Sequence, residues 1–472
     1  MENSTTISQQ TPKNPLGYKP ISSLLISFSV PAIISCLINS IYNIVDQIFI
    51  GQGVGYLGNA ATTVAFPIMT IILAFGTLIG AGSSAYAAIR LGEKNEEEAE
   101  RTLNNAFLFT ILVGVVLMVL GLIFLKPILI LFGATPNIMP YAIDYTAIIL
   151  IGTPFNMIGI VLSNLARTDG HPRLSMYGML IGAVLNTILD PIYIFVFHWG
   201  VKGAAIATIT SQIISAVVLT IYFVKKVKKP IHMRLKKKYQ KLSWRRIWRF
   251  ITLGVSSGIT QSVACIMQVV MNNSLVYYGN QSPIGGDVAL SAMGIVMKVS
   301  MIMAAFGVGV GIGAQPILGF NRGAQQYRRI KKTYLMAVIF ATALILIGWI
   351  FCQTMPETII SIFGNENAQF TGFAVSCLRI YLFSIFCAGF QIVSTNYFQA
   401  TGQPLKASIL SMLRQLLLLI PLILILPLFM GLNGILYSAP IADAASAVIV
   451  AFFIIPEMRK LNRNIKLEQP AS

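Results

Sequence analysis

The chain has 472 residues, of which 56% are hydrophobic and only 11% carry a charged side chain. Soluble domains are about one quarter charged, so a single soluble globule and a disordered chain are both excluded. The net charge of +18 would suit nucleic acid. The apolar runs between the basic residues and the mean hydropathy of +0.75 indicate a lipid bilayer instead.

Cysteine and the N-terminal segment add little. The five cysteines follow no C-x-x-C spacing and stand singly inside apolar stretches, which is typical of small buried residues rather than of disulfides or a metal site. The first 20 residues are polar and contain no apolar signal-peptide core. We therefore expect the N-terminus to stay in the cytoplasm.

Twelve segments are long and apolar enough to cross a membrane, which takes about 20 residues. In the first half they run at 22–50, 60–84, 103–125, 138–165, 175–197 and 202–224, and in the second at 248–278, 287–314, 330–352, 370–398, 407–429 and 433–456. This pattern predicts an all-α integral membrane protein. The expected parts are an N-terminal tail (1–21), an N-lobe (22–224), a basic linker (225–247), a C-lobe (248–456) and a C-terminal tail (457–472).

The basic residues predict the orientation. With the N-terminus inside, 29 of the 34 Lys and Arg fall on the cytoplasmic side, including Arg167 and Arg173 between spans four and five and twelve residues at 225–249. The outer loops contain Lys126 and Lys202, and three basic residues lie within spans: Lys298, Arg379 and Arg414. Positive charge marks cytoplasmic loops, so both termini are expected in the cytoplasm. The linker is expected to contact lipid headgroups rather than nucleic acid.

An internal repeat predicts the architecture. At a constant offset of 231 residues, four glycines of the first half match four of the second: Gly76, Gly80, Gly82 and Gly92 with Gly307, Gly311, Gly313 and Gly323. Shifted by one residue, Gly170 and Pro172 match Gly402 and Pro404. An even number of spans per repeat gives both halves the same orientation. We expect two six-helix bundles related by a pseudo-twofold axis along the membrane normal, as in parallel-repeat secondary transporters.

Polar stripes in the first half indicate a buried site. Asn39, Tyr42, Asn43 and Asp46 share one face of span one, and Asn186 and Asp190 share one face of span five. Span six adds Thr208, Ser211, Gln212 and Ser215. An ionisable group in hydrocarbon costs about 3 kcal/mol or more, so these stripes favour an oxygen-rich cavity for a proton or Na⁺ over plain hydrogen bonding between helices.

The second half offers accessory candidates. Spans seven and eight contribute neutral amides and flexible thioethers that could line a substrate cleft, beside one cation: Gln261, Gln268, Met293, Met297 and Lys298. Methionine at helical spacing is more often packing. Asp443 in span twelve is a lone acid, and its partner among Lys298, Arg379 and Arg414 is left open. In span one, Pro31 is a candidate hinge.

The chain resembles the multidrug and toxic compound extrusion (MATE) family over nearly its whole length. The residues that carry the resemblance are FSVPAIISCLINSIYNIVDQIFIGQGVG, GTLIGAGSSAYAAIRLGE and LNTILDPIYIFVFHWGVKGAAIAT. The resemblance implies an N-lobe cation site at Asp46, Tyr145, Asn186, Asp190 and Thr208. The span-seven Glu and span-ten Asp of some members are absent here, so the chain looks like the branches that couple through the N-lobe.

The expected function is efflux across the inner membrane. A monomer would expel amphipathic, often cationic drugs in exchange for H⁺ or Na⁺, with no cofactor, no resident metal, no covalent chemistry and no nucleic-acid partner. A lipid-linked oligosaccharide flippase of the same superfamily is the alternative, although a more cationic cavity would suit its pyrophosphate. A membrane-embedded enzyme is less favoured, because the chain contains no H-E-x-x-H motif and its histidines are scattered: His171, His198 and His232.

Overall fold

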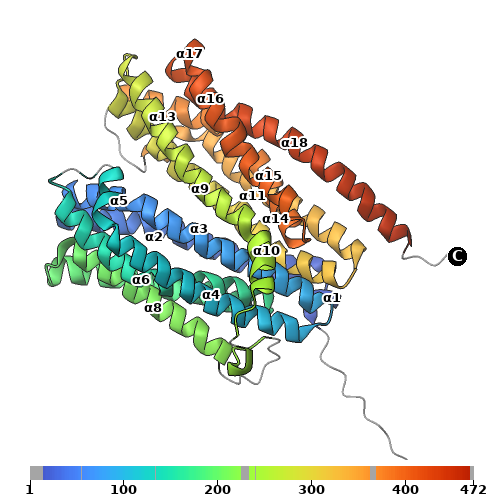
Figure 1. Ribbon diagram of the computed structural model, residues 1–472. Helices are drawn as coiled ribbons and strands as arrows, with labels where there is room; N and C mark the ends of the chain where they lie inside the picture. The colour runs from blue at the N-terminus through green and yellow to red at the C-terminus, as the bar shows by residue number, and fades with distance from the viewer. Residues whose placement is uncertain are drawn as a thin grey trace, which may run out of the picture.

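The computed structural model describes residues 14–54, 56–132, 134, 136–224, 233–239, 241–361 and 368–467. Every regular element of these residues is a helix, and the helices form two bundles that lie side by side (Figure 1). Long apolar runs become helices because a helix satisfies all its backbone hydrogen bonds internally, which hydrocarbon requires. The N-lobe is built from α2 (Ile21–Val54), α3 (Tyr56–Gly92), α4 (Glu96–Ile123), α6 (Met139–Thr168), α7 (Pro172–Pro191) and α8 (Gly200–Val224).

The second bundle, the C-lobe, contains more interrupted helices. Its long members are α9 (Trp244–Asn280), α10 (Gly286–Gly323), α11 (Tyr327–Thr354) and α18 (Leu432–Leu467). Between them lie α12 (Pro356–Ser361), α13 (Ala368–Tyr381), α14 (Cys387–Ala400), α15 (Pro404–Met412), η3 (Leu413–Leu419), α16 (Ile420–Ile425) and α17 (Pro427–Met430). The remaining short elements are α1 (Pro15–Tyr18), α5 (Leu125–Leu131), η1 (Ile192–Val196) and η2 (Lys237–Tyr239).

Eleven helices of the described chain are individually long and apolar enough to cross a membrane. The prediction of a continuous tenth span at 370–398 was wrong, because α13 and α14 are separated by a turn. The Phe383 carbonyl that the turn removes from the helix accepts a hydrogen bond from Trp349 Nε1 of α11 at 2.7 Å. Counted together, α13 and α14 complete the six crossing segments of the C-lobe, so the architecture is the expected pair of six-helix bundles.

Two further spans are irregular within the membrane. The fifth span continues from α7 into the π-helical η1 directly after Pro191, and the eleventh passes through the π-helical η3 shortly before Pro421. Proline lacks a backbone N–H and disturbs the regular α-helical hydrogen bonds, and π-helical turns often accompany functional sites. By contrast, α2 runs through Pro31 without a break. The hinge role of Pro31 stays a prediction.

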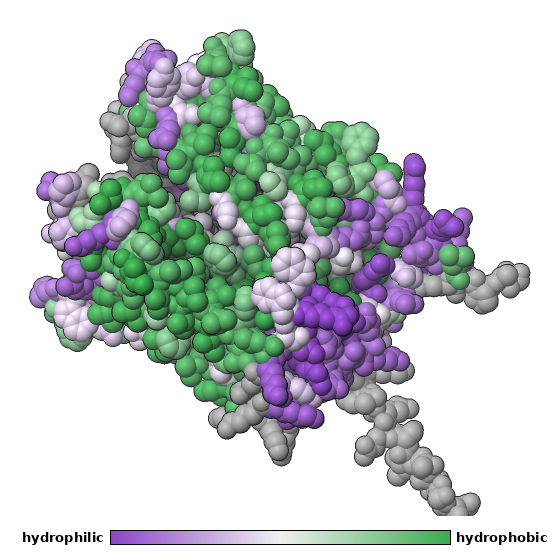
Figure 2. Space-filling model, viewed as in Figure 1, coloured by the Kyte–Doolittle hydropathy of each residue, from purple (hydrophilic) through white to green (hydrophobic). Residues whose placement is uncertain are grey.

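Charged side chains gather at the two ends of the molecule. Polar residues gather beside α1 and the C-terminal end of α18, whereas an apolar belt covers the helices (Figure 2). We call this end the basic end, because salt bridges there involve Arg90, Arg101, Lys236 and Arg246. Asp144 and Lys202 pair at the opposite end, at 3.2 Å.

The repeated glycines bring the lobes together near the basic end. A Cβ added to Gly82 of α3 would clash with the Phe250 carbonyl of α9, and one on Gly313 of α10 would lie 2.6 Å from Ser29 Cα of α2. Gly92 and Gly323 pack reciprocally against the facing backbones of α10 and α3. From this region the two lobes diverge toward α5 and α17 (Figure 1). Two glycines of each repeat therefore mark the contact between lobes, and the other two of each repeat pack within their own lobe.

The glycine contacts make a prediction about stability. Gly82→Ala should destabilise the protein by about 1–3 kcal/mol, because the added methyl group overpacks a backbone contact. Gly159→Ala in α6 is the matched control, since nothing lies within 4 Å of its added Cβ, and the higher helix propensity of alanine should make it neutral or stabilising by up to about 1 kcal/mol. Thermal unfolding of both variants in one detergent measures the difference. Equal stability of the two variants would contradict the packing argument.

Candidate functional site

Two carboxyl groups from different helices meet inside the N-lobe. Asp46 lies on α2 and Asp190 on α7, the two helices pack against each other, and both side chains are buried. The carboxyl groups lie within hydrogen-bonding reach of each other. The polar stripes of spans one and five thus face one another, as helical periodicity predicts for two stripes that both turn toward the inside of one bundle.

Hydroxyl and amide groups of four helices surround the pair. Asn186 Nδ2 donates to Asp190 Oδ1 and to Thr208 Oγ1 of α8, both at 3.2 Å. The hydroxyl group of Tyr42 lies near that of Thr208. Tyr145 of α6 is buried within electrostatic range of both carboxyl groups. All five residues that the resemblance implies are therefore near one another, joined by Tyr42.

Three buried oxygen atoms of this site lack a hydrogen-bond donor among the described residues. Among the described residues none donates a hydrogen bond to Asp46 Oδ1, Asp190 Oδ2 or Asn186 Oδ1, although all three atoms are buried. Buried polar atoms are normally hydrogen-bonded. Oxygen atoms of carboxylates and amides suit a proton or a hard monovalent cation.

The two carboxyl groups also interact through their charge. Two ionised carboxylates in contact inside a low-dielectric bundle repel strongly, and burial penalises each of them. The arrangement is therefore stable only when a proton or a bound cation compensates one of the negative charges. A proton and a cation would compete for the same oxygen atoms.

The structure disperses the other residues predicted for the site. Asn39 is exposed, and the side chain of Asn43 lies outside the described part. Gln212 and Gln261 are half-buried, and Gln268 Nε2 donates to Asn272 Oδ1 at 3.0 Å. Met293 is buried in the C-lobe core, Met297 packs against that core, and Lys298 is exposed. The two methionines thus occupy packing positions in this arrangement of the lobes, and the role of the whole set in binding substrate stays a prediction.

Asp443 of the C-lobe has Arg414 as its cationic partner. Arg414 Nε, on η3, donates to Asp443 Oδ1 of α18 at 2.5 Å, and the Asp443 side chain is only 2% exposed. Gln391 and Ser446 lie next to this pair, with Ser446 Oγ donating to Gln391 Oε1 at 3.2 Å. Asp443 therefore has a fixed cationic partner, whereas among the described residues no cation forms a salt bridge with Asp46 or Asp190.

One residue predicted to lie in a loop is buried. Arg167 was expected to be a cytoplasmic loop charge that sets topology, but it belongs to the last turn of α6 and is 6% exposed. The helix extends beyond the apolar run of span four, because Asn164 and Ser175 supply polar partners for the guanidinium inside the bundle.

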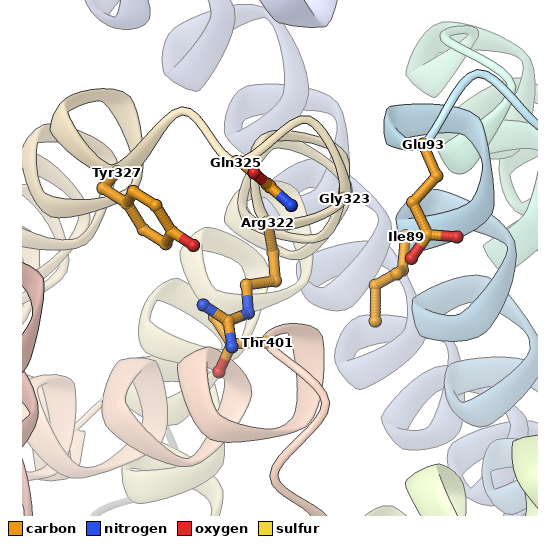
Figure 3. A pocket seen from close by; sticks show the side chains of 7 residues that line it. All are labelled: Ile89, Glu93, Arg322, Gly323, Gln325, Tyr327 and Thr401. Atoms are coloured by element: carbon orange, nitrogen blue, oxygen red, sulfur yellow. The ribbon is translucent and has the colours of Figure 1, made fainter. Parts of the chain in front are cut away.

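A separate pocket lies between the lobes at the basic end. It has a volume of about 400 Å³, and Figure 3 shows Glu93, in the turn after α3, on one side and Arg322 of α10 on the other. Tyr327 and Thr401 complete its C-lobe side. None of the residues of the carboxyl pair lines it.

Comparison with known proteins agrees with this architecture. The MatE family model matches residues 31–192 and 262–453. A Staphylococcus haemolyticus (strain JCSC1435) protein named multidrug export protein MepA is 27% identical over 443 residues, covering 93% of this chain and 94% of the relative. Its namesake from Staphylococcus saprophyticus is 28% identical over 441 residues, covering 91% and 93%.

A solved structure shares the fold. It is described as the outward-facing conformation of a multidrug resistance MATE family transporter of the MOP superfamily, and it matches with a TM-score of 0.89 at 21% identity over 96% of this chain and 99% of that chain. The fold is thus that of a helical membrane protein of two repeated lobes. The chain belongs to the MatE family.

The Arg414–Asp443 pair yields a prediction. Arg414→Met should destabilise the protein by about 3–5 kcal/mol, because it leaves the Asp443 carboxylate buried without a partner. The double variant Arg414→Met with Asp443→Leu should recover most of that loss, since an apolar pair of similar volume replaces the ion pair. Thermal unfolding of the single and double variants measures both effects. A single variant as stable as the parent protein would show that the pair does not hold the helices together.

Proposed function

We propose that the protein is a cation-coupled multidrug efflux antiporter. It exports amphipathic, often cationic organic compounds in exchange for inward movement of H⁺ or Na⁺. The names of the relatives support multidrug export. Both repeats belong to one chain, so one copy forms the transport unit.

The proposed coupling rests on the buried carboxyl pair. Asp46 and Asp190 lie within hydrogen-bonding reach, and each has an oxygen atom that receives no hydrogen bond from the described residues. The pair can take up one proton or one Na⁺ and become less charged, which removes the electrostatic cost of a bundle rearrangement within lipid. The neutral Asn186, Thr208 and Tyr145 would complete the oxygen cage around a cation.

Orientation follows from the positive-inside rule. With the basic end in the cytoplasm, the lobes are closed on the cytoplasmic side and diverge toward the outside. A cation would enter from the outside, and its binding would favour rearrangement of α2 and release of substrate. Coupling is reciprocal, so substrate bound between the lobes from the cytoplasm would in turn favour release of the cation.

The carboxyl pair yields a prediction in cells. Asp46→Asn and Asp190→Asn should each abolish drug resistance at normal expression, because an amide neither takes up a proton at neutral pH nor attracts a cation. Asn186 already places an amide in the site, so the added amides should be tolerated structurally. Asp144→Asn at the opposite end is the matched control and should keep most of the resistance. Full resistance in both site variants would refute the site.

The coupling ion is tested in purified form. Proteoliposomes that contain the protein receive a pH gradient or a Na⁺ gradient separately, and uptake of a fluorescent organic cation is recorded. One of the two gradients should drive uptake severalfold above that of ion-equilibrated vesicles, and drug added alone should dissipate the same gradient. Uptake that ignores both gradients would exclude a cation antiporter.

A further inference from the structure

The strongest unexplained charge inside the N-lobe is Arg167. Its side chain is 6% exposed and lies among α2, α6 and α7. Nη1 donates to Ser175 Oγ at 2.9 Å and Nη2 donates to Asn164 Oδ1 at 3.0 Å. Both partners are neutral. A buried cation normally needs an anion, and among the described residues no carboxylate forms a salt bridge with Arg167.

The nearest acid along the chain is occupied elsewhere. Asp169 Oδ2 accepts from the Tyr222 hydroxyl at 2.8 Å, and Asp169 Oδ1 accepts from the Met233 backbone at 3.0 Å. The same carboxylate lies 3.7 Å from His171 Nδ1. These contacts tie Asp169 to α8 and to the linker. The positive charge of Arg167 is consequently left to act on the interior of the lobe.

The repeat shows that this charge is not needed for the local architecture. Asn164 Nδ2 donates to Ile160 O at 2.9 Å and packs against Gly80; in the C-lobe, its repeat mate Asn396 donates to Ile392 O at 2.9 Å and packs against Gly311. At the same offset Arg167 corresponds to Gln399, which is also buried, at 2% exposure, and donates to Leu253 O at 2.9 Å. At this position of the repeat the C-lobe thus carries a neutral amide, whereas the N-lobe carries a cation.

Arg167 lies on the basic-end side of the carboxyl pair. Cys36 of α2 is within electrostatic range of the guanidinium, and Asp46 is ten residues further along the same helix, about 15 Å at the usual helical rise. Between them Ser40 is buried and donates to the Cys36 carbonyl at 3.0 Å. Arg167 and the carboxyl pair therefore lie at different depths along α2, with the guanidinium on the side of the basic end.

We infer that Arg167 is an electrostatic barrier between the carboxyl pair and the basic end. A fixed positive charge in a low-dielectric interior repels protons and metal cations, as arginine does in selective pores. A cation held at Asp46 and Asp190 then cannot continue to the basic end while the lobes are closed there. The ion crosses only when the lobes rearrange, which keeps its movement coupled to substrate. This inference rests on the proposed function.

The test measures how fast the ion gradient leaks across liposome membranes in the absence of substrate. Purified parent protein and Arg167→Gln are reconstituted into liposomes, the coupling gradient is imposed without drug, and its decay is followed. Arg167→Gln, which installs the residue of the other lobe, should speed the decay at least about fivefold, whereas Arg167→Lys, which keeps the charge, should stay within about twofold of the parent protein. Adding Asp46→Asn to Arg167→Gln should suppress the leak, because the leaking ion passes the carboxyl pair.

Three results would overturn the barrier, and one of them would also refute the proposed function. Arg167→Gln vesicles that still take up drug and are as tight as the parent would overturn the barrier alone. A leak that persists in the double variant with Asp46→Asn would also overturn it, since the ion would then follow another path. Parent protein that couples drug to neither gradient would refute the proposed function and the barrier with it. If Arg167→Gln does not fold, Arg167→Met also removes the positive charge, and its leak is measured in the same way.

Discussion

The constraint on which the structure depends is that charge inside hydrocarbon must be compensated locally. The C-lobe meets it with a fixed partner, because Arg414 binds Asp443 directly. The N-lobe places Asp46 and Asp190 near each other instead, and among the described residues no cation forms an ion pair with either. The same fold, repeated twice, thus contains one site neutralised by a fixed ion pair and one that, under the proposed function, a mobile ion neutralises.

Irregular backbone accompanies both charged sites. The π-helical η1 begins two residues after Asp190, and Arg414 itself lies within the π-helical η3. A π-helical turn changes the direction of the side chains that follow, and it costs hydrogen-bond quality that a purely structural helix would keep. In each lobe the departure from regular geometry therefore coincides with a side chain that must be aimed inward.

The sequence predicted the large features because they rest on periodicity. Twelve apolar runs, a constant offset and three polar stripes suffice to place two bundles and to bring Asp46 toward Asp190. What it could not predict depends on contacts between distant segments. The break near Phe383 is tolerated because Trp349, on another helix, takes up the freed carbonyl. Burial of Arg167 depends on partners from two helices, and only its comparison with Gln399 could have marked it.

The glycine contacts between lobes have a further consequence, for the rate of motion. At Gly82, Gly92, Gly313 and Gly323 the nearest atoms of the facing helix are mainly backbone, so these four positions themselves insert no side chain that has to change rotamer before the lobes part. Glycine also buries almost no apolar area, so these points add little hydrophobic free energy to the closed arrangement. The two arrangements can then lie close in free energy, and bilayer thickness or lateral pressure becomes able to shift the balance between them.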